Sequence, residues 1–257
     1  MPTSPKAKLE SVTVPVMRGR VALVTGGAKR IGKAIAVELA RAGADVAIMY
    51  RGSASEARAT VRQLRTHGIR ALAIQCDVGA ERSVREAVKE VIRKMGRLDV
   101  LVNNAGAYEA VAFEKLTARQ WDTVFATNTR GPFLMSRECA AELRKRHGRI
   151  VNIGSMGGIR PWPTHVHYCA SKAALHMLTL GMAKALAPEV AVNCVAPGMI
   201  YQDEPHGSEE RERIIARTPL QRAGKAQDIA AAVLFLASSA EFVTGQVVVV
   251  DGGLGIG

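Results

Sequence analysis

The sequence predicts a single-domain α/β fold in which a seven-stranded parallel sheet is covered by helices on both faces. Three observations support this prediction. Short apolar runs alternate with longer helical patterns from residue 20 to the end of the 257-residue chain. The runs are apolar on nearly every residue, as strands that are covered on both faces require. No internal repeat or interior linker divides the pattern, so we expect one doubly wound domain that binds ligands beyond the carboxyl ends of its strands.

Each expected strand is a short apolar run, and the segments between the runs have helical periodicity. The expected strands are 21–25, 46–50, 71–75, 98–102, 149–153, 190–196 and 247–250. The expected helices are 31–41, 53–67, 81–95, 117–147, 166–186, 209–217 and 226–237. A glycine follows each of the first three helices as a cap: Gly43, Gly68 and Gly96. Thr117 and Gln120 have capping-box spacing at the start of the fourth helix, which Pro132 should kink.

The composition is that of an ordinary globular protein, with 48% hydrophobic and 23% charged residues. No apolar run approaches the roughly 20 residues that a membrane span needs, so we expect no membrane association. Residues 1–18 contain no apolar stretch typical of a signal peptide. We expect a flexible leader there, a catalytic domain at 19–257 and a cytoplasmic location. Four widely spaced cysteines predict neither a metal site nor a disulfide framework: Cys76, Cys139, Cys169 and Cys194.

The formal net charge of +12 raises the question of a polyanionic partner. Stacking on single-stranded nucleic acid needs basic residues interleaved with exposed aromatic side chains. Only 4% of the residues are aromatic, and most lie inside expected strands or helices. The basic cluster at 144–147 lies at the end of an expected helix, where cations suit the helix dipole. We therefore expect no nucleic-acid partner.

A glycine-containing loop, Thr25-Gly-Gly-Ala-Lys-Arg-Ile-Gly32, joins the first expected strand to the first helix. Glycines at this turn allow the backbone to approach a pyrophosphate at the helix N-terminus. The second strand ends at Arg51 and Ser53, where NAD-selective sites place an Asp or Glu. Arg51 and Ser53, joined by Lys29 and Arg30, can instead bind a 2′-phosphate. The pattern favours NADPH or NADP as the cofactor, and the alternative is that Arg51 is merely a solvated surface residue.

Tyr168 and Lys172 are spaced to share one face of an expected helix. A carbonyl that accepts a hydride needs a proton donor, and the usual tyrosine pKa of about 10 is high for this task near neutral pH. We expect the Lys172 ammonium to lower the pKa of Tyr168. Ser155, just past the fifth strand, is expected to polarise the carbonyl oxygen. Asn128 lies inside the long fourth helix near Pro132.

In their combined order and spacing, these motifs closely resemble the short-chain dehydrogenase/reductase family, from Arg20 to Gly253. The resemblance implies a Rossmann fold and a homotetramer or homodimer. It also implies Tyr168 as acid/base, Lys172 as its electrostatic partner, Ser155 as substrate orienter and Asn128 as anchor of a proton relay. The other positions that match the family's cofactor contacts are Gly26, Ile31, Gly32, Asp77, Val78, Asn103, Ala105, Gly106, Pro197, Gly198 and Ile200.

The family also implies what some of these positions contact. Asp77 with Val78 would hold the adenine, and Asn103 with Gly106 the adenosine-side ribose and backbone contacts. Gly198 with Ile200 would hold the nicotinamide end. The chain departs from the family pattern at two positions. Arg30 replaces the middle glycine of the loop, as in NADPH-preferring members, and Gln202 replaces a Thr that often contacts the pyrophosphate.

Substrate selection is expected in residues 107–113, in 156–167 and in a lid at 200–218. The candidate contacts are Tyr108, Met156, Trp162 and Tyr201. The interpretation is a reductase of ketones, with 3-oxoacyl thioesters among the substrates considered. A pteridine-type reductase acting on a dihydropterin C=N bond is the alternative, since residues 50–57 and Tyr108 resemble that group. Those enzymes carry Asp at the position of Ser155, which favours a ketone here. A protein that only senses dinucleotides would lack the Tyr168–Lys172 pair.

Overall fold

The computed structural model describes residues 16–201 and 209–256, and it confirms the predicted seven-stranded parallel sheet. The strands lie in the order β3-β2-β1-β4-β5-β6-β7, so the winding direction reverses between β1 and β4. In open α/β sheets, ligands bind at such a reversal. The strands are β1 (Val21–Thr25), β2 (Asp45–Tyr50), β3 (Ala71–Gln75), β4 (Val100–Asn103), β5 (Arg149–Ile153), β6 (Ala191–Pro197) and β7 (Val247–Val250).

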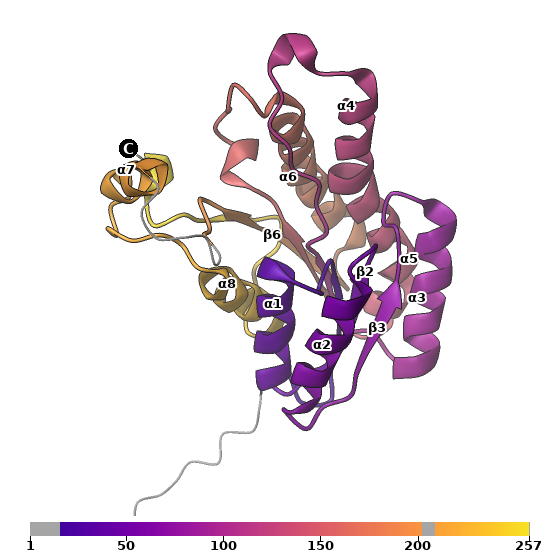
Figure 1. Cartoon of the computed structure of the whole chain (residues 1–257). Coiled ribbons are helices and arrows are strands. Elements are labelled where there is room, and N and C mark those ends of the chain that lie inside the picture. The colour runs from indigo at the N-terminus through magenta and orange to yellow at the C-terminus, as the bar shows by residue number, and fades with distance from the viewer. Residues whose placement is uncertain (1–15, 202–208, 257) are drawn as a thin grey trace, which may run out of the picture.

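Helices cover both faces of the sheet (Figure 1). They are α1 (Arg30–Arg41), α2 (Ala54–Arg65), α3 (Glu81–Met95), α4 (Ala118–Phe125), α5 (Gly131–Lys145), α6 (Val166–Leu186), α7 (Glu209–Arg217) and α8 (Ala226–Ser238). Successive strand residues point to opposite faces, so Val24 packs in the core with α1, α2 and α8. Leu23 packs in the other core, with α3, α5 and α6. Because the central strands pack against helices on both faces, they read as nearly continuous apolar runs.

The long helix expected at 117–147 is divided by a π-helical turn, Ala126–Arg130, between α4 and α5. The capping box at its start is confirmed, because the Gln120 backbone N–H donates to Thr117 Oγ1 at 3.3 Å and the Thr117 N–H donates to Gln120 Oε1 at 3.1 Å. Pro132 stands in the first turn of α5, where its missing N–H is tolerated. In place of the expected proline kink, the structure has a widened π-helical turn, which places Asn128 toward the sheet edge. Such turns are common at functional sites.

The packed domain begins before residue 19. Met17 is fully buried, and its backbone N–H donates to the Ala42 carbonyl at 2.8 Å. The rest of the expected leader, residues 1–15, and part of the expected lid, 202–208, lie outside the described residues. In the described part of the chain, no helix has both the length and the apolar character needed to cross a membrane. All four cysteines are free and buried, and no His, Cys, Asp and Glu cluster among the described residues could hold a metal ion.

Candidate active site

The structure brings the predicted catalytic side chains together at the carboxyl edge of the sheet. Tyr168 and Lys172 lie one turn apart on α6, and the Lys172 Nζ is 5.8 Å from the centre of the Tyr168 ring. Lys172 is held in place by donating to the Ile153 carbonyl, the last residue of β5, at 2.7 Å. Ser155 follows two residues later, and its side chain is hydrogen-bonded to Tyr168. Its Oγ also accepts from the Gly157 N–H at 3.0 Å, which fixes the hydroxyl beside the tyrosine.

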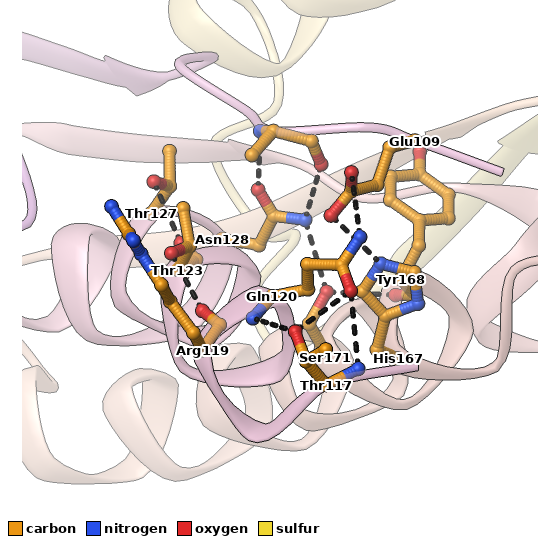
Figure 2. A network of polar contacts seen from close by, with 11 residues as sticks. Glu109, Thr117, Arg119, Gln120, Thr123, Thr127, Asn128, His167, Tyr168 and Ser171 are labelled. Atoms are coloured by element: carbon orange, nitrogen blue, oxygen red, sulfur yellow. Dashed lines mark hydrogen bonds and ion pairs between the residues drawn. The ribbon is translucent and has the colours of Figure 1, made fainter. Parts of the chain in front are cut away.

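Asn128 is fully buried and fastens the segment after β4 to the helices (Figure 2). Its Nδ2 donates to the Ala107 carbonyl and to Ser171 Oγ, both at 3.0 Å. Its Oδ1 accepts from the Ala107 N–H at 2.8 Å. The Asn128 amide therefore binds both backbone groups of Ala107 and connects this segment to Ser171 on α6. Its predicted role as the anchor of a proton relay toward Lys172 stays a prediction.

Burial controls the protonation of this site. It raises the pKa of Tyr168 to about 12, and the hydrogen bond with Ser155 opposes this only in part. The net pKa of Tyr168 is therefore raised, whereas the sequence led us to expect a lowered pKa. The Lys172 ammonium is directed at the Ile153 carbonyl, and desolvation of the phenolate is the larger effect. Burial also lowers the pKa of Lys172 to about 8.

The glycine loop is built for close approach of a ligand to the backbone. Gly26 has φ +64°, which glycine adopts without strain. A Cβ on Gly32 would lie 2.3 Å from the Gly26 carbonyl oxygen and 2.4 Å from Asn104 Nδ2, so only glycine fits there. Asn104 donates to the carbonyls of Thr25 and Gly26, at 2.9 and 3.2 Å. Sequence reasoning missed Asn104, although its place beside Asn103, at the end of β4, could have indicated a role in this loop.

The predicted phosphate-binding side chains lie on two neighbouring loops. Lys29 and Arg30 are exposed at the start of α1, and Arg51 is exposed just past β2, next to half-buried Ser53. The loops are joined because the Gly27 N–H donates to the Met49 carbonyl at 3.1 Å. Arg30 has φ +52°, a left-handed conformation that is strained for a residue with a Cβ. The backbone of Arg30 therefore has the left-handed conformation that suits the glycine found here in the family pattern, and its side chain places a cation at this position.

Two residues predicted to hold the adenosine end have side chains that point elsewhere. Asn103 is buried, and its amide donates to Ser136 Oγ at 3.2 Å and to Asn152 Oδ1 at 2.9 Å. Val78 is also buried and packs against Gly131. Val78 can offer a ligand only its backbone, whereas Asn103 Oδ1 has no hydrogen-bond partner among the described residues, so the ribose contact expected of Asn103 stays a prediction. Asp77 is exposed at the end of β3, and its Oδ1 accepts from the Gly79 N–H at 2.9 Å.

The remaining predicted cofactor residues follow the carboxyl ends of β4 and β6 or lie at the start of α1. Ala105 and Gly106 follow β4, and a Cβ on Gly106 would lie 3.5 Å from Asn128 Oδ1 and 3.9 Å from Lys172 Nζ. At the end of β6, Gly198 packs so closely on Asp251 that a Cβ would lie 2.5 Å from it. Its neighbours in the chain are Pro197, the last residue of β6, and Ile200, which forms a β-bridge with Gly224. Ile31 is half-buried in the first turn of α1.

Comparison with known proteins places this arrangement in a family. The model of a family described as Enoyl-(Acyl carrier protein) reductase matches residues 26–255. The 3-oxoacyl-[acyl-carrier-protein] reductase FabG of Staphylococcus aureus is 39% identical over 238 residues, which are 91% of this chain and 97% of that protein. This chain belongs to the short-chain dehydrogenase/reductase family. It is therefore an oxidoreductase, as its sequence predicted.

Solved structures share the fold of this chain closely. A short-chain dehydrogenase from Burkholderia cenocepacia, crystallised in complex with NADP, is 40% identical and has a TM-score of 0.87. The match covers 93% of this chain and 98% of that one. A blue fluorescent protein from a metagenomic library, crystallised with NADPH, is 39% identical with a TM-score of 0.87, over 92% of this chain and 98% of that chain.

The candidate substrate residues of this short-chain dehydrogenase/reductase are divided between two places. Tyr108 and Trp162 both lie against Tyr168, with ring centroids at 4.9 and 6.1 Å. Met156 is buried in the short helix that follows Ser155, and a Cβ on Gly255 would lie 3.5 Å from its Sδ. Tyr201 instead lies near Gly224 and under the Arg211 guanidinium, which is 5.2 Å from its ring centroid.

A polar chain tethers the loop that carries Tyr108 (Figure 2). Glu109 Oε1 is 3.5 Å from Nε2 of fully buried His167, and Glu109 Oε2 accepts from Gln120 Nε2 at 3.4 Å. Gln120 in turn belongs to the capping box with Thr117. The Gln120–Glu109 hydrogen bond links the loop after β4 to the start of α4, and the Glu109–His167 contact lies next to it on the side of α6.

His176 is a buried polar residue of the site that the sequence analysis overlooked. It lies one turn beyond Lys172 on α6, and the Ser155 backbone N–H donates to its Nε2 at 3.4 Å. A Cβ on Gly154 would lie 2.3 Å from Nε2, and a Cβ on Gly158 would lie 2.6 Å from Cε1. Burial, with the nearby Lys172 charge, lowers the pKa of His176 to about 4. The ring is therefore neutral at physiological pH and can accept this hydrogen bond.

We expect His176→Leu to lower kcat by about fivefold to tenfold, because one net hydrogen bond that holds Ser155 is lost. His176→Gln places an acceptor near the position of Nε2 and is expected to recover most of the rate. Steady-state kinetics with a ketone and a separate titration of cofactor affinity measure the effect. Equal rates for the Leu and Gln variants would show that the ring only fills space.

Proposed function

We propose that this protein is an NADPH-dependent ketone reductase, with 3-oxoacyl thioesters within its substrate range, and that Tyr168 is the proton donor. The observation that carries the proposal is half-buried Tyr168, whose side chain is hydrogen-bonded to Ser155 and whose ring centre lies 5.8 Å from Lys172 Nζ. FabG of Staphylococcus aureus, named a 3-oxoacyl-[acyl-carrier-protein] reductase, supports carbonyl chemistry. The structures crystallised with NADP and NADPH support the cofactor.

The residues present fit such a cofactor. The loop 25–32 offers a glycine cradle that a side chain at Gly32 would fill, at the N-terminus of a helix, where anions are favoured. The exposed cations of Lys29, Arg30 and Arg51 stand around this loop and the end of β2. Guanidinium groups bind phosphate through paired charge-assisted hydrogen bonds. This set suits a 2′-phosphate better than an uncharged ribose hydroxyl.

The roles of the side chains follow from their placement. Bound NADPH supplies the hydride that reaches the carbonyl carbon. The carbonyl oxygen gains negative charge as its π-bond opens, and the Ser155 hydroxyl is placed to hold that oxygen. Tyr168 gives its proton to the oxygen, which completes the alcohol. The phenolate that remains is stabilised by Lys172, whose Nζ lies 5.8 Å from the ring centre.

The proposal is tested by following NADPH oxidation with a panel of carbonyl substrates. The panel contains acetoacetyl thioesters, diketones, aryl ketones and quinones, with a dihydropterin as the C=N substrate. Each substrate is also assayed with NADH. Turnover of at least one ketone with preference for NADPH is the expected result. Turnover of the dihydropterin alone, or a clear preference for NADH, would contradict the proposal.

We expect kcat/KM for ketone reduction to fall as the pH rises through about 8. Lys172 is charged below its lowered pKa of about 8 and loses its charge above it, so the support for the Tyr168 phenolate is lost on the alkaline side. Tyr168 itself keeps its proton across this range, because its pKa is raised to about 12. A pH–rate profile measures this limb. A Lys172→Arg variant keeps its charge, so a wild-type limb at pH 8 that persists in this variant would refute the assignment.

We also propose that the protein forms a homotetramer. Apolar side chains are exposed on two separate faces: Trp121 and Phe133 on α4 and α5, and Phe235, Val248 and Val249 on α8 and β7. Exposed apolar patches of this kind mark association surfaces. Light scattering should give a mass near four times the 27.4 kDa chain. Phe133→Glu and Val249→Glu should each yield dimers, and a monomeric wild-type protein would contradict the proposal.

A further inference from the structure

The catalytic tyrosine belongs to a closed cluster of four aromatic rings, called here the ring cluster: Tyr108, Trp162, His165 and Tyr168. Tyr108 stacks on His165 with centroids 4.7 Å apart, and Trp162 stacks on Tyr168 at 6.1 Å. The two stacked pairs meet at nearly right angles. Tyr108 meets Tyr168 at 88°, and His165 meets Trp162 at 85°. Each ring thus contacts two others, and the four form a corner around the tyrosine.

The ring cluster is rigid on one side and open on the other. The side chain of Thr164 contacts His165 Nδ1 at 2.9 Å, and Gly157 allows Trp162 to come close, since a Cβ there would lie 3.3 Å from both Trp162 Cζ3 and Ser155 Oγ. Tyr108, in contrast, is 60% exposed. Its ring therefore offers an aromatic surface to any molecule whose carbonyl reaches Ser155 and Tyr168. The loop that carries it is held by the hydrogen bond from Gln120 Nε2 to Glu109 Oε2.

The exposed aromatic surface of the ring cluster favours a ligand with a flat π-system over a ligand with a flexible chain. Aromatic rings in offset or edge-to-face contact gain about twofold to tenfold in binding for each pair, beyond the area that they bury. A saturated acyl chain gains only from burial, and it loses rotational freedom when it is fixed between rings. The rings of the cluster are already held in place before a ligand arrives, so little ordering opposes the contact.

We propose that the preferred substrates are ketones joined directly to a planar conjugated ring, which lies against Tyr108 while the carbonyl meets Ser155 and Tyr168. This inference rests on the proposed ketone reduction and narrows its substrate class. The ring cluster places one aromatic wall beside the proton donor and a second, Trp162, parallel to the donor ring. A linear 3-oxoacyl thioester uses the same catalytic groups without the stacking contacts.

A matched pair of 3-oxo esters tests the substrate class: ethyl benzoylacetate, with a phenyl ring on the ketone, and ethyl 3-cyclohexyl-3-oxopropanoate, with a saturated ring of similar size. The measured quantity is the ratio of their kcat/KM values, phenyl over cyclohexyl, in each variant. We expect Tyr108→Leu to lower this ratio by about twofold to tenfold, the loss of one aromatic contact. Tyr108→Phe retains the ring and is expected to retain the ratio.

An unchanged ratio in Tyr108→Leu would overturn the inference. This holds whether kcat/KM stays the same for both esters or falls equally for both, because an equal fall means that Tyr108 only supports the packing of Tyr168. Binding separates this inference from the proposed function. Calorimetry with the NADP complex of Tyr168→Phe measures the affinity of both esters without turnover. If the wild type reduces neither ester, the proposed ketone reduction fails for these substrates. Tighter binding of the phenyl ester would then still support stacking on Tyr108. Equal binding of the two esters would refute stacking.

Discussion

The Tyr168→Phe variant is expected to reduce ketones about 10²–10⁴-fold more slowly than the wild type, the range that a placed general acid contributes. The substitution removes only the hydroxyl, so the ring contacts with Tyr108 and Trp162 remain. Burial raises the pKa of this phenol to about 12, which keeps the proton on the oxygen at neutral pH. A group that holds its proton in the resting state suits donation to an oxygen that becomes strongly basic when the hydride arrives.

Two controls keep the interpretation of this variant specific. Its thermal melting temperature and its affinity for NADPH should equal those of the wild type, because the hydroxyl lies away from the expected phosphate site. Ser155→Ala leaves the donor in place and should reduce kcat less than Tyr168→Phe does. A Tyr168→Phe enzyme with more than a tenth of the wild-type kcat would show that another group, or water, supplies the proton.

The sheet was predictable because its physical signal is local and strong. Residues of β1 and β6 are buried on both faces, so each strand is a continuous apolar run that few other structures would tolerate. The boundary of β4 was predicted two residues too early at its start. The reason is Asp99, a buried carboxylate that accepts from the Val21 N–H at 2.8 Å, so pairing of β4 with β1 begins at Val100. A side-chain contact between distant segments sets where the strand begins, and the apolar pattern of the sequence does not record such contacts.

The candidate site was predictable only as far as its motifs extend. Ser155, Tyr168 and Lys172 were found from residue type and spacing, and the fold brings them together. The lowered pKa expected for Tyr168 was not found, because desolvation depends on packing that the sequence pattern does not reveal. His176 was overlooked for a related reason. Its partner is a backbone N–H 21 residues away, and its ring fits only because Gly154 and Gly158 lack side chains.

The second large effect is expected from Arg51→Asp, which should weaken NADPH binding by about 100-fold and improve NADH binding. The exposed guanidinium of Arg51, just past β2, is placed for charge-assisted hydrogen bonds with a 2′-phosphate, and such bonds contribute about 1.5–3 kcal/mol each. An aspartate there would repel the phosphate and accept from the free ribose hydroxyl of NADH. Titration of both cofactors, with kcat/KM for each, measures the change in preference.

Net charge must be separated from local contact in this experiment, because the chain carries +12 and any loss of cations weakens anion binding somewhat. Arg62→Asp provides the matched control. Arg62 is exposed in the last turn of α2, and its replacement changes the charge by the same two units. At physiological ionic strength, exposed charges more than about 8 Å apart are largely screened. Arg62→Asp should therefore alter NADPH affinity by less than about twofold. Equal losses in both variants would mean that the basic surface attracts the cofactor without a specific phosphate contact at Arg51.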